Sequence, residues 1–177
     1  MQERGTVTAL TGPTDGDVGT APAATRRAPV NRVLVAAAVA AGVVVVDQLT
    51  KWWALDRLSH GSIHLLGPLS LTLTRNRGSA FSLFQGQAPL LVTVAVVLVV
   101  VLLLVARAAP GAGRAAAIGL IVGGALGNLA DRLFRSDHGA VVDFIALHFW
   151  PTFNVADSCI VVGTILVAVS VLRGSPG

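Results

Sequence analysis

Four long apolar segments constrain this chain more than any other feature of its sequence. Each is close to the length of about 20 residues that a helix needs to cross a hydrocarbon core of about 30 Å. Backbone N–H and C=O groups cannot stay unpaired in lipid, so segments of this kind must be helices. The predicted spans are residues 33–54, 89–107, 115–134 and 155–172. We therefore expect an all-α membrane protein with four transmembrane helices.

The composition agrees with a lipid environment and excludes several classes of soluble protein. Charged residues make up 12% of the 177 residues, against about 25% in a soluble domain. A net charge of +4 could indicate a nucleic-acid partner. The basic residues instead lie singly at the ends of apolar runs, so we interpret them as membrane flanks and expect no nucleic acid. The single cysteine, Cys159, excludes a disulfide framework and a cysteine-based zinc site.

The polar segments define the rest of the organisation. Residues 1–31 are rich in Gly, Thr, Pro and Ala and are predicted to be a disordered tail, followed by one membrane domain over residues 32–173. The long connection at 55–88 contains an alternating stretch at 70–74, which predicts a strand, and a second short strand is expected over 80–84. A small β element outside the membrane is therefore expected between the first two helices.

Four spans place both termini on one side of the membrane. Basic residues near the N-terminus and at Arg107, Arg114 and Arg173 favour the cytoplasm for that side, although the opposite side carries a similar number. The residues on the opposite side are interleaved with Asp, Asn and Gly, as in a functional site. We expect cytoplasmic termini and a site near the extracytoplasmic surface.

Acidic residues in apolar surroundings identify that site. Asp47, Asp131, Asp143 and Asp157 lie in or beside apolar segments and fall on the same membrane side. A charge at the bilayer centre costs about 3 kcal/mol or more, so such residues face a bundle interior or a wet cavity. Asp47 and Lys51 are four residues apart, which predicts an ion pair on one helix that also orients neighbouring groups.

Asp143 and Asp157 allow two interpretations. Asp143 could reach water from the interface, and Asp157 could only cap a helix that begins after Asn154. Alternatively, the short connection between the two acids brings their carboxyl groups together. Such a pair shares one proton and can hydrolyse a peptide by acid–base catalysis, as in aspartic proteases. The chain lacks the H-E-x-x-H, G-x-S-x-G and phosphate-loop patterns, so neither metal nor cofactor is expected.

Five motifs give the chain a resemblance to a known family. In chain order they are 47–51 (DQLTK), 75–81 (RNRGSAF), 123–132 (GGALGNLADR), 141–144 (VVDF) and 153–157 (FNVAD). Their order and their position on four predicted spans resemble the lipoprotein signal peptidases, the bacterial signal peptidase II family.

The resemblance implies an aspartic endopeptidase of the bacterial inner membrane, inhibited by globomycin. It would remove signal peptides from diacylglyceryl-modified prolipoproteins by cutting before the lipidated cysteine. The family's catalytic aspartates correspond to Asp143 and Asp157, and its β cradle to the expected β element. The substrate-binding or supporting positions would be Asn76, Gly78, Asn128, Asp131, Arg132, Asn154, Ala156, Asp47 and Lys51. The chain departs from the family at Arg77 and Ser79 and in a short 144–153 loop, which bears on substrate preference.

Two other classes of function stay open at this stage. A small ion or proton transporter could use intramembrane carboxylates as a relay, but it would place acids at several depths, and here they gather near one surface. A non-enzymatic membrane scaffold would tolerate Asp-to-Asn changes at both Asp143 and Asp157.

Overall fold

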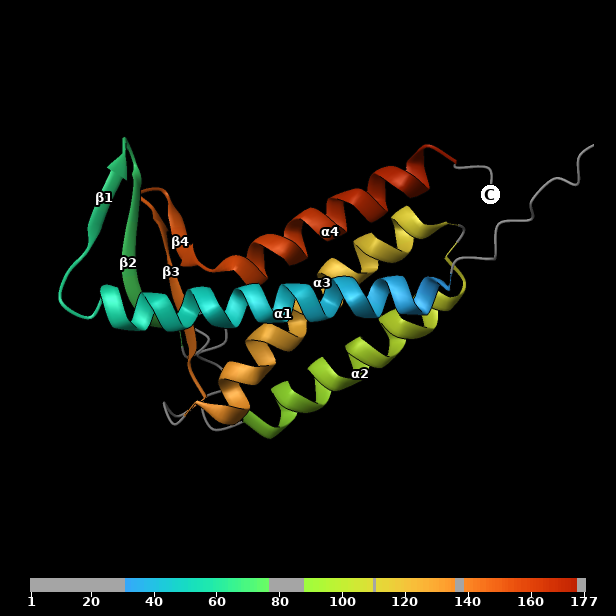
Figure 1. Cartoon of the computed structure of the whole chain (residues 1–177), viewed down its shortest axis with the longest axis horizontal. Coiled ribbons are helices and arrows are strands. Elements are labelled where there is room, and N and C mark those ends of the chain that lie inside the picture. The colour runs from blue at the N-terminus through green and yellow to red at the C-terminus, as the bar shows by residue number, and fades with distance from the viewer. Residues whose placement is uncertain (1–30, 77–87, 110, 136–138, 175–177) are drawn as a thin grey trace, which may run out of the picture.

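The structure is a bundle of helices with a small sheet across one end. The computed structural model describes residues 31–76, 88–109, 111–135 and 139–174. The elements, in chain order, are α1 (Arg32–Arg57), β1 (Ile63–Leu66), β2 (Leu69–Asn76), α2 (Ala88–Arg107), α3 (Ala112–Phe134), β3 (Val141–Leu147), β4 (Trp150–Phe153) and α4 (Val155–Leu172). Helix α1 begins and α4 ends at the end of the bundle opposite the sheet (Figure 1). The predicted tail lies almost entirely outside the described residues.

Three of the predicted spans are confirmed as helices that suit a membrane. Among the residues that the structure describes, α1, α3 and α4 are long and apolar enough to cross one. Helix α2 covers the fourth predicted segment, and its crossing of the membrane stays a prediction. The apolar side chains on the outer faces of α1 and α4 are exposed, including Leu49, Val161 and Ile165, as expected for helices that face lipid.

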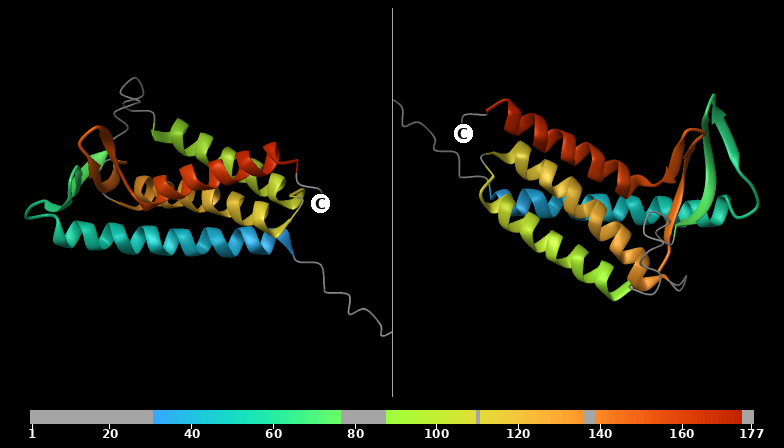
Figure 2. Two further views of the ribbon diagram at one scale, coloured as in Figure 1. Left: turned by 90° about the horizontal axis from the view of Figure 1, so that it is seen from above. Right: turned by 180° about the vertical axis from the view of Figure 1, so that it is seen from behind.

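Helix α3 is the centre of the bundle and packs against each of the other helices (Figure 2). Its glycines allow this closeness. A Cβ atom at Gly119 would lie 2.6 Å from the backbone oxygen of Ala36, and one at Gly123 would lie 2.8 Å from that of Ala40, both on α1. At Gly124 a Cβ would clash with the backbone oxygen of Ala156 on α4. This ridge of small residues on α3 therefore lets the helices pack closely together.

The sheet is antiparallel throughout, in the order β1-β2-β3-β4. Strand β2 contains the predicted strand at 70–74, whereas the strand expected over 80–84 lies outside the described residues. Leu66 pairs with Leu69, so Gly67 and Pro68 form a tight connection in which Gly67 has a φ of 53°. Glycine suits that left-handed conformation because it has no Cβ.

The expectation of a β element from the first connection alone was incomplete. Half of the sheet, β3 and β4, comes from the connection between α3 and α4, which the sequence analysis treated as a loop. The four residues Val141 to Phe144 are all buried, so β3 lacks the alternation of apolar and polar residues that reveals a half-buried strand. Asp143 consequently lies on a central strand and does not reach water from a loop.

Helix packing generates a stability prediction with an internal control. Gly123→Ala should lower the melting temperature of the detergent-solubilised protein, because overpacking costs about 1–3 kcal/mol and outweighs the roughly 1 kcal/mol that alanine gains in a helix. At Gly42, also on a helix, an added Cβ meets nothing within 4 Å. Gly42→Ala should therefore leave the melting temperature unchanged or raise it. Equal shifts for the two variants would contradict close packing at Gly123.

Candidate active site

Buried polar side chains collect where the helices meet the sheet. Among the residues that the structure describes, seven polar or charged residues are buried, namely Asp47, Lys51, Ser70, Asn128, Asp131, Asp143 and Asn154. All except Ser70 were singled out from the sequence, and they come from α1, α3, β3 and the start of α4. Within the part of the chain that the structure describes, every buried side-chain nitrogen and oxygen has a hydrogen-bond partner. The site is thus a complete polar network.

Lys51 is the hub of this network. Its ammonium group is fully buried and lies 2.8 Å from Asp47 Oδ2 and 3.0 Å from Asp131 Oδ2. Its third contact is Asn128 Oδ1, at 2.9 Å. An ammonium group has three N–H donors, so these three acceptors satisfy it completely. The predicted Asp47–Lys51 ion pair is confirmed, and it extends across the bundle to α3.

The two carboxylates that bind Lys51 also hold backbone groups beside the predicted catalytic acids. Asp47 Oδ1 accepts a hydrogen bond from the backbone N–H of Ala156, at 3.0 Å. Asp131 Oδ2 accepts one from the backbone N–H of Val142, also at 3.0 Å. Ala156 directly precedes Asp157, and Val142 directly precedes Asp143. The ion cluster therefore fixes the chain immediately before each acid.

The sequence analysis missed two members of this cluster. Arg135 Nε donates to Asp131 Oδ1 at 2.7 Å, and the Arg135 guanidinium also donates to Gln48 Oε1 at 3.0 Å. Gln48 Nε2 in turn lies 3.1 Å from Asp131 Oδ1. The neighbouring Arg132, one of the predicted supporting residues, donates to the backbone oxygen of Asn128 at 3.4 Å. The spacing of four residues between Asp131 and Arg135 was the signal available in the sequence.

Gly127 makes room for a side chain, whereas the other glycines of α3 named above make room for the backbone of a neighbouring helix. A Cβ atom there would lie 2.6 Å from Asp47 Oδ2, the oxygen that binds Lys51. The absence of a side chain at Gly127 thus lets α1 bring its carboxylate against α3.

Asn154 caps α4 and also contacts both acids. Its Oδ1 accepts the backbone N–H of Asp157 at 2.9 Å, and its own backbone N–H donates to Asp157 Oδ2 at 3.2 Å, which completes the predicted capping box. Its Nδ2 donates to Asp143 Oδ1 at 2.7 Å and lies 3.1 Å from Asn128 Oδ1. Asn128 Nδ2 donates to Asp157 Oδ1 at 2.8 Å. Two amides therefore connect Asp143 and Asp157, so the cap is part of a larger arrangement.

Asp143 and Asp157 have different surroundings. Asp143 is only 1% exposed, whereas Asp157 is half-buried. Burial raises the pKa of Asp143 to about 6; hydrogen bonds from Asn76 and Asn154 oppose the rise, and the negative charge of Asp157 adds to it. Asp143 thus keeps its proton at pH values where an ordinary aspartate is ionised.

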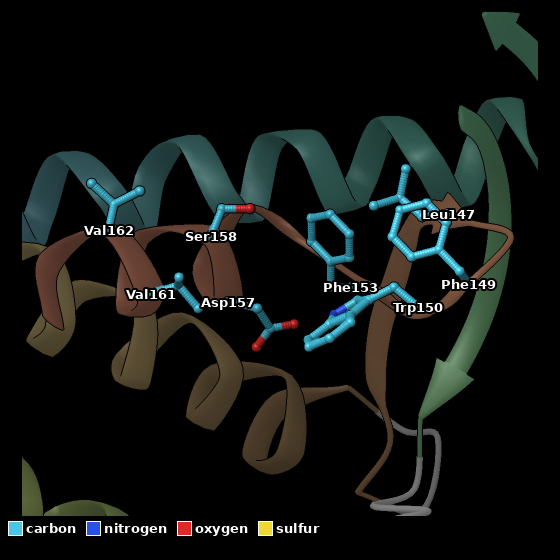
Figure 3. Close-up of a pocket in the computed structure, with 8 residues that line it drawn as sticks. All are labelled: Leu147, Phe149, Trp150, Phe153, Asp157, Ser158, Val161 and Val162. Atoms are coloured by element: carbon cyan, nitrogen blue, oxygen red, sulfur yellow. The ribbon is translucent and has the colours of Figure 1, made fainter. Parts of the chain in front are cut away.

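A cavity of about 370 Å³ opens beside Asp157. Figure 3 shows the Asp157 carboxylate on the α4 side of this cavity, facing the indole of Trp150. Apart from Asp157 and Ser158 the lining is apolar, and it comprises Leu147, Phe149, Trp150, Phe153, Val161 and Val162. Leu147, Phe149, Trp150 and Phe153 belong to the β3–β4 hairpin, which was not predicted from the sequence, whereas Val161 and Val162 lie on the predicted helix α4.

Of the remaining predicted residues, the structure places Asn76 beside Asp143 but does not describe Gly78. Asn76 ends β2 opposite Val141 and hydrogen-bonds to Asp143. Gly78, together with the family departures at Arg77 and Ser79, lies outside the described residues. Among the residues that are described, no group of three or more His, Cys, Asp or Glu side chains could hold a metal ion.

Comparison with known proteins gives a consistent result. The family described as Signal peptidase (SPase) II matches residues 39–173. The chain is similar to the lipoprotein signal peptidase of Rhodococcus jostii (strain RHA1), with 45% identity over 142 residues, covering 77% of this chain and 72% of that protein. It is also similar to the lipoprotein signal peptidase of Clostridium novyi (strain NT), with 41% identity over 139 residues, covering 73% and 92%. A solved bacterial membrane enzyme, determined by the in meso method at 1.9 Å resolution, superimposes with a TM-score of 0.71 at 28% identity, covering 79% of this chain and 94% of that chain.

The buried Asp143 generates a prediction about stability and pH. The unfolded chain loses this proton near pH 3.8 and the folded chain near pH 6. The stabilising effect of the neutral carboxyl is therefore complete below about pH 4 and is lost as the pH rises through 6. Asp143→Asn keeps a neutral side chain at every pH. At pH 7.5 it should therefore raise the free energy of unfolding by up to about 3 kcal/mol, and the melting temperature with it.

At pH 4 the advantage of Asp143→Asn should disappear, because both proteins then carry a neutral group. Thermal unfolding of the two purified proteins at pH 4 and pH 7.5 measures the difference. An equal difference at both pH values would contradict a raised pKa at Asp143.

Proposed function

The chain belongs to the signal peptidase II family, and from that premise we propose that Asp143 and Asp157 are the catalytic pair of an aspartic endopeptidase. The substrate would be a diacylglyceryl-modified prolipoprotein, cut on the N-terminal side of its lipidated cysteine. The observation that carries the proposal is the linkage of the two carboxyl groups through Asn128 and Asn154 beside an apolar cavity.

Family membership decides between the functions that the sequence left open. The relatives that match at 36–45% identity are lipoprotein signal peptidases. The predicted signal peptidase II activity is thereby confirmed, and the transporter alternative is not favoured.

The different surroundings of the two acids support a division of labour. Asp143 is buried, which favours its neutral form, so it is the acid that hydrogen-bonds to the oxygen of the scissile carbonyl. Asp157 lies at the cavity and takes a proton from the attacking water. As the water oxygen bonds to the carbonyl carbon, Asp143 gives its proton to the carbonyl oxygen. When the C–N bond breaks, Asp157 passes its proton to the leaving amine and Asp143 recovers its own, so the pair carries one proton before and after the reaction.

The cavity suits a substrate that is apolar on both sides of the scissile bond. Val161 and Val162 extend the lining along α4, away from the sheet, into the part of the helix that suits a membrane. Phe149, Trp150 and Phe153 cover the sheet side (Figure 3). Signal-peptide residues before the cut and acyl chains after it are both compatible with such a lining. Globomycin-type inhibitors would compete for the same space, in contact with membrane lipid.

The orientation in the bacterial inner membrane is part of the proposal. The start of α1 and the end of α4 lie at the end of the bundle opposite the site (Figure 1). With cytoplasmic termini, the sheet and the catalytic pair would lie near the extracytoplasmic surface, where α2 completes four spans. The domain is then residues 32–173, preceded by a cytoplasmic tail.

The catalytic pair predicts that Asp143→Asn and Asp157→Asn each abolish cleavage of a lipidated prolipoprotein while the protein stays folded and binds substrate. General acid–base catalysis contributes about 10²- to 10⁴-fold, and losing either acid should remove at least that much. The double variant should be little worse than either single variant, because the pair acts as a unit. Cleavage by the purified enzyme is measured as the change in gel mobility of the lipidated prolipoprotein.

Asp56→Asn is the matched control. Asp56 is exposed and pairs with its neighbour Arg57 at 3.7 Å near the end of α1, so this variant should cleave normally. Near-normal turnover by Asp157→Asn would leave that residue as a helix cap alone and would remove it from the catalytic pair.

The topology predicts different labelling of two positions. In a Cys159→Ala background, a cysteine at Gly111 should be protected from a membrane-impermeant thiol reagent in intact cells, and one at Ser62 should react. Gly111 lies between α2 and α3, and Ser62 precedes β1 at the opposite end. External labelling of the Gly111 cysteine would reverse the orientation.

A further inference from the structure

The amide of Asn128 can take only one orientation in this network. Its oxygen faces the ammonium group of Lys51 at 2.9 Å, and that group offers donors only. A flipped amide would set its own N–H₂ group against the N–H donor that Lys51 directs at Asn128. The amide nitrogen must therefore point the other way, where it donates to Asp157 Oδ1 at 2.8 Å.

Lys51 also influences the second amide. The oxygen of Asn128 accepts a hydrogen bond from Asn154 Nδ2 at 3.1 Å, and the same nitrogen donates to Asp143 Oδ1 at 2.7 Å. Fixing Asn128 thus fixes an acceptor for Asn154. One buried cation is connected through two amides to both acids.

We propose that Lys51 is a positioning residue for the peptidase reaction, which acts through Asn128 to hold Asp157 in its reactive orientation. This inference rests on the proposed catalytic role of Asp157. Lys51 uses its three donors within the network, so none is available for substrate. Its cationic charge polarises the Asn128 amide and strengthens the hydrogen bond to Asp157.

The ion cluster contains a second cation that serves as a matched control. Within the part of the chain that the structure describes, Arg135 pairs with Asp131 and contacts Gln48, and it hydrogen-bonds to neither Asn128 nor the two acids. Lys51→Met and Arg135→Met each remove one positive charge from the same cluster. Only Lys51→Met removes the donor that orients Asn128.

The experiment measures kcat and KM of both variants on a lipidated prolipoprotein, together with their melting temperatures. Lys51→Met should lower kcat roughly 100-fold, the size of effect expected for a displaced catalytic group, and change KM less than about threefold, because the apolar cavity is intact. Arg135→Met should lower the melting temperature and lower kcat far less than Lys51→Met does. Equal values of kcat for the two variants would overturn the proposal.

Removing Lys51 leaves Asp47 and Asp131 facing each other, so the single variant could fail to fold. Lys51→Met combined with Asp47→Asn restores the charge balance, since one carboxylate then faces one cation, Arg135. This double variant then replaces Lys51→Met in the comparison with Arg135→Met. Its kcat should also fall roughly 100-fold, and a kcat equal to that of Arg135→Met would overturn the proposal.

The route through Asn128 has its own test. In an Asn128→Ala background, the Lys51 substitution should lower kcat by no more than about threefold further, and a full additional loss would overturn the route. Asp157→Asn is measured in parallel. An active Asp157→Asn enzyme would refute the proposed function, whereas an inactive one beside a fully active Lys51 variant would refute only the positioning role.

Discussion

The buried ammonium group of Lys51, enclosed by Asp47, Asp131 and Asn128, is the interaction on which the site end of this protein depends. Burying charges is costly unless they are paired and hydrogen-bonded, and loss of one partner of a buried pair costs about 3–5 kcal/mol. Here two carboxylates face two cations, Lys51 and Arg135, so the cluster is neutral overall. The same carboxylates also accept hydrogen bonds from the backbone N–H groups of Val142 and Ala156, the residues before Asp143 and Asp157. Removal of the cluster would therefore loosen both β3 and the start of α4.

The polar network of the site consequently depends on how closely the helices pack. The glycines of α3 bring α1 and α4 close enough for side chains from three elements to share one polar network. Gly127 shows the connection most directly, because any side chain there would push away the Asp47 oxygen that binds Lys51. The glycines along most of α3 allow close packing of the helices. Gly127, the last of them, also makes room for the Asp47 carboxylate that binds Lys51.

The sequence was sufficient for features that depend on local pattern. Apolar length predicted the helices, the spacing of Asp47 and Lys51 predicted their ion pair, and Asn154 with Asp157 predicted the capping box. The motifs also indicated which polar residues meet. The β3–β4 hairpin was not predictable in this way, because a strand buried on both faces has no alternation, and its apolar contribution to the cavity was missed with it. The partners of Asp131 depend on contacts between α1 and α3, which a local pattern does not contain.

The fold itself creates the difference between the two acids. Both oxygens of Asp157 accept N–H donors, one from the Asn128 amide and one from the Asn154 backbone, so its carboxyl group is held at the start of α4 beside the cavity. Asp143 lies on a central strand behind it, where burial disfavours a negative charge. The capping box that starts α4 therefore also orients the proposed base, and the strand that carries Asp143 also buries the proposed acid. A helix cap and a buried strand, each needed for the fold, together give two chemically identical side chains different surroundings.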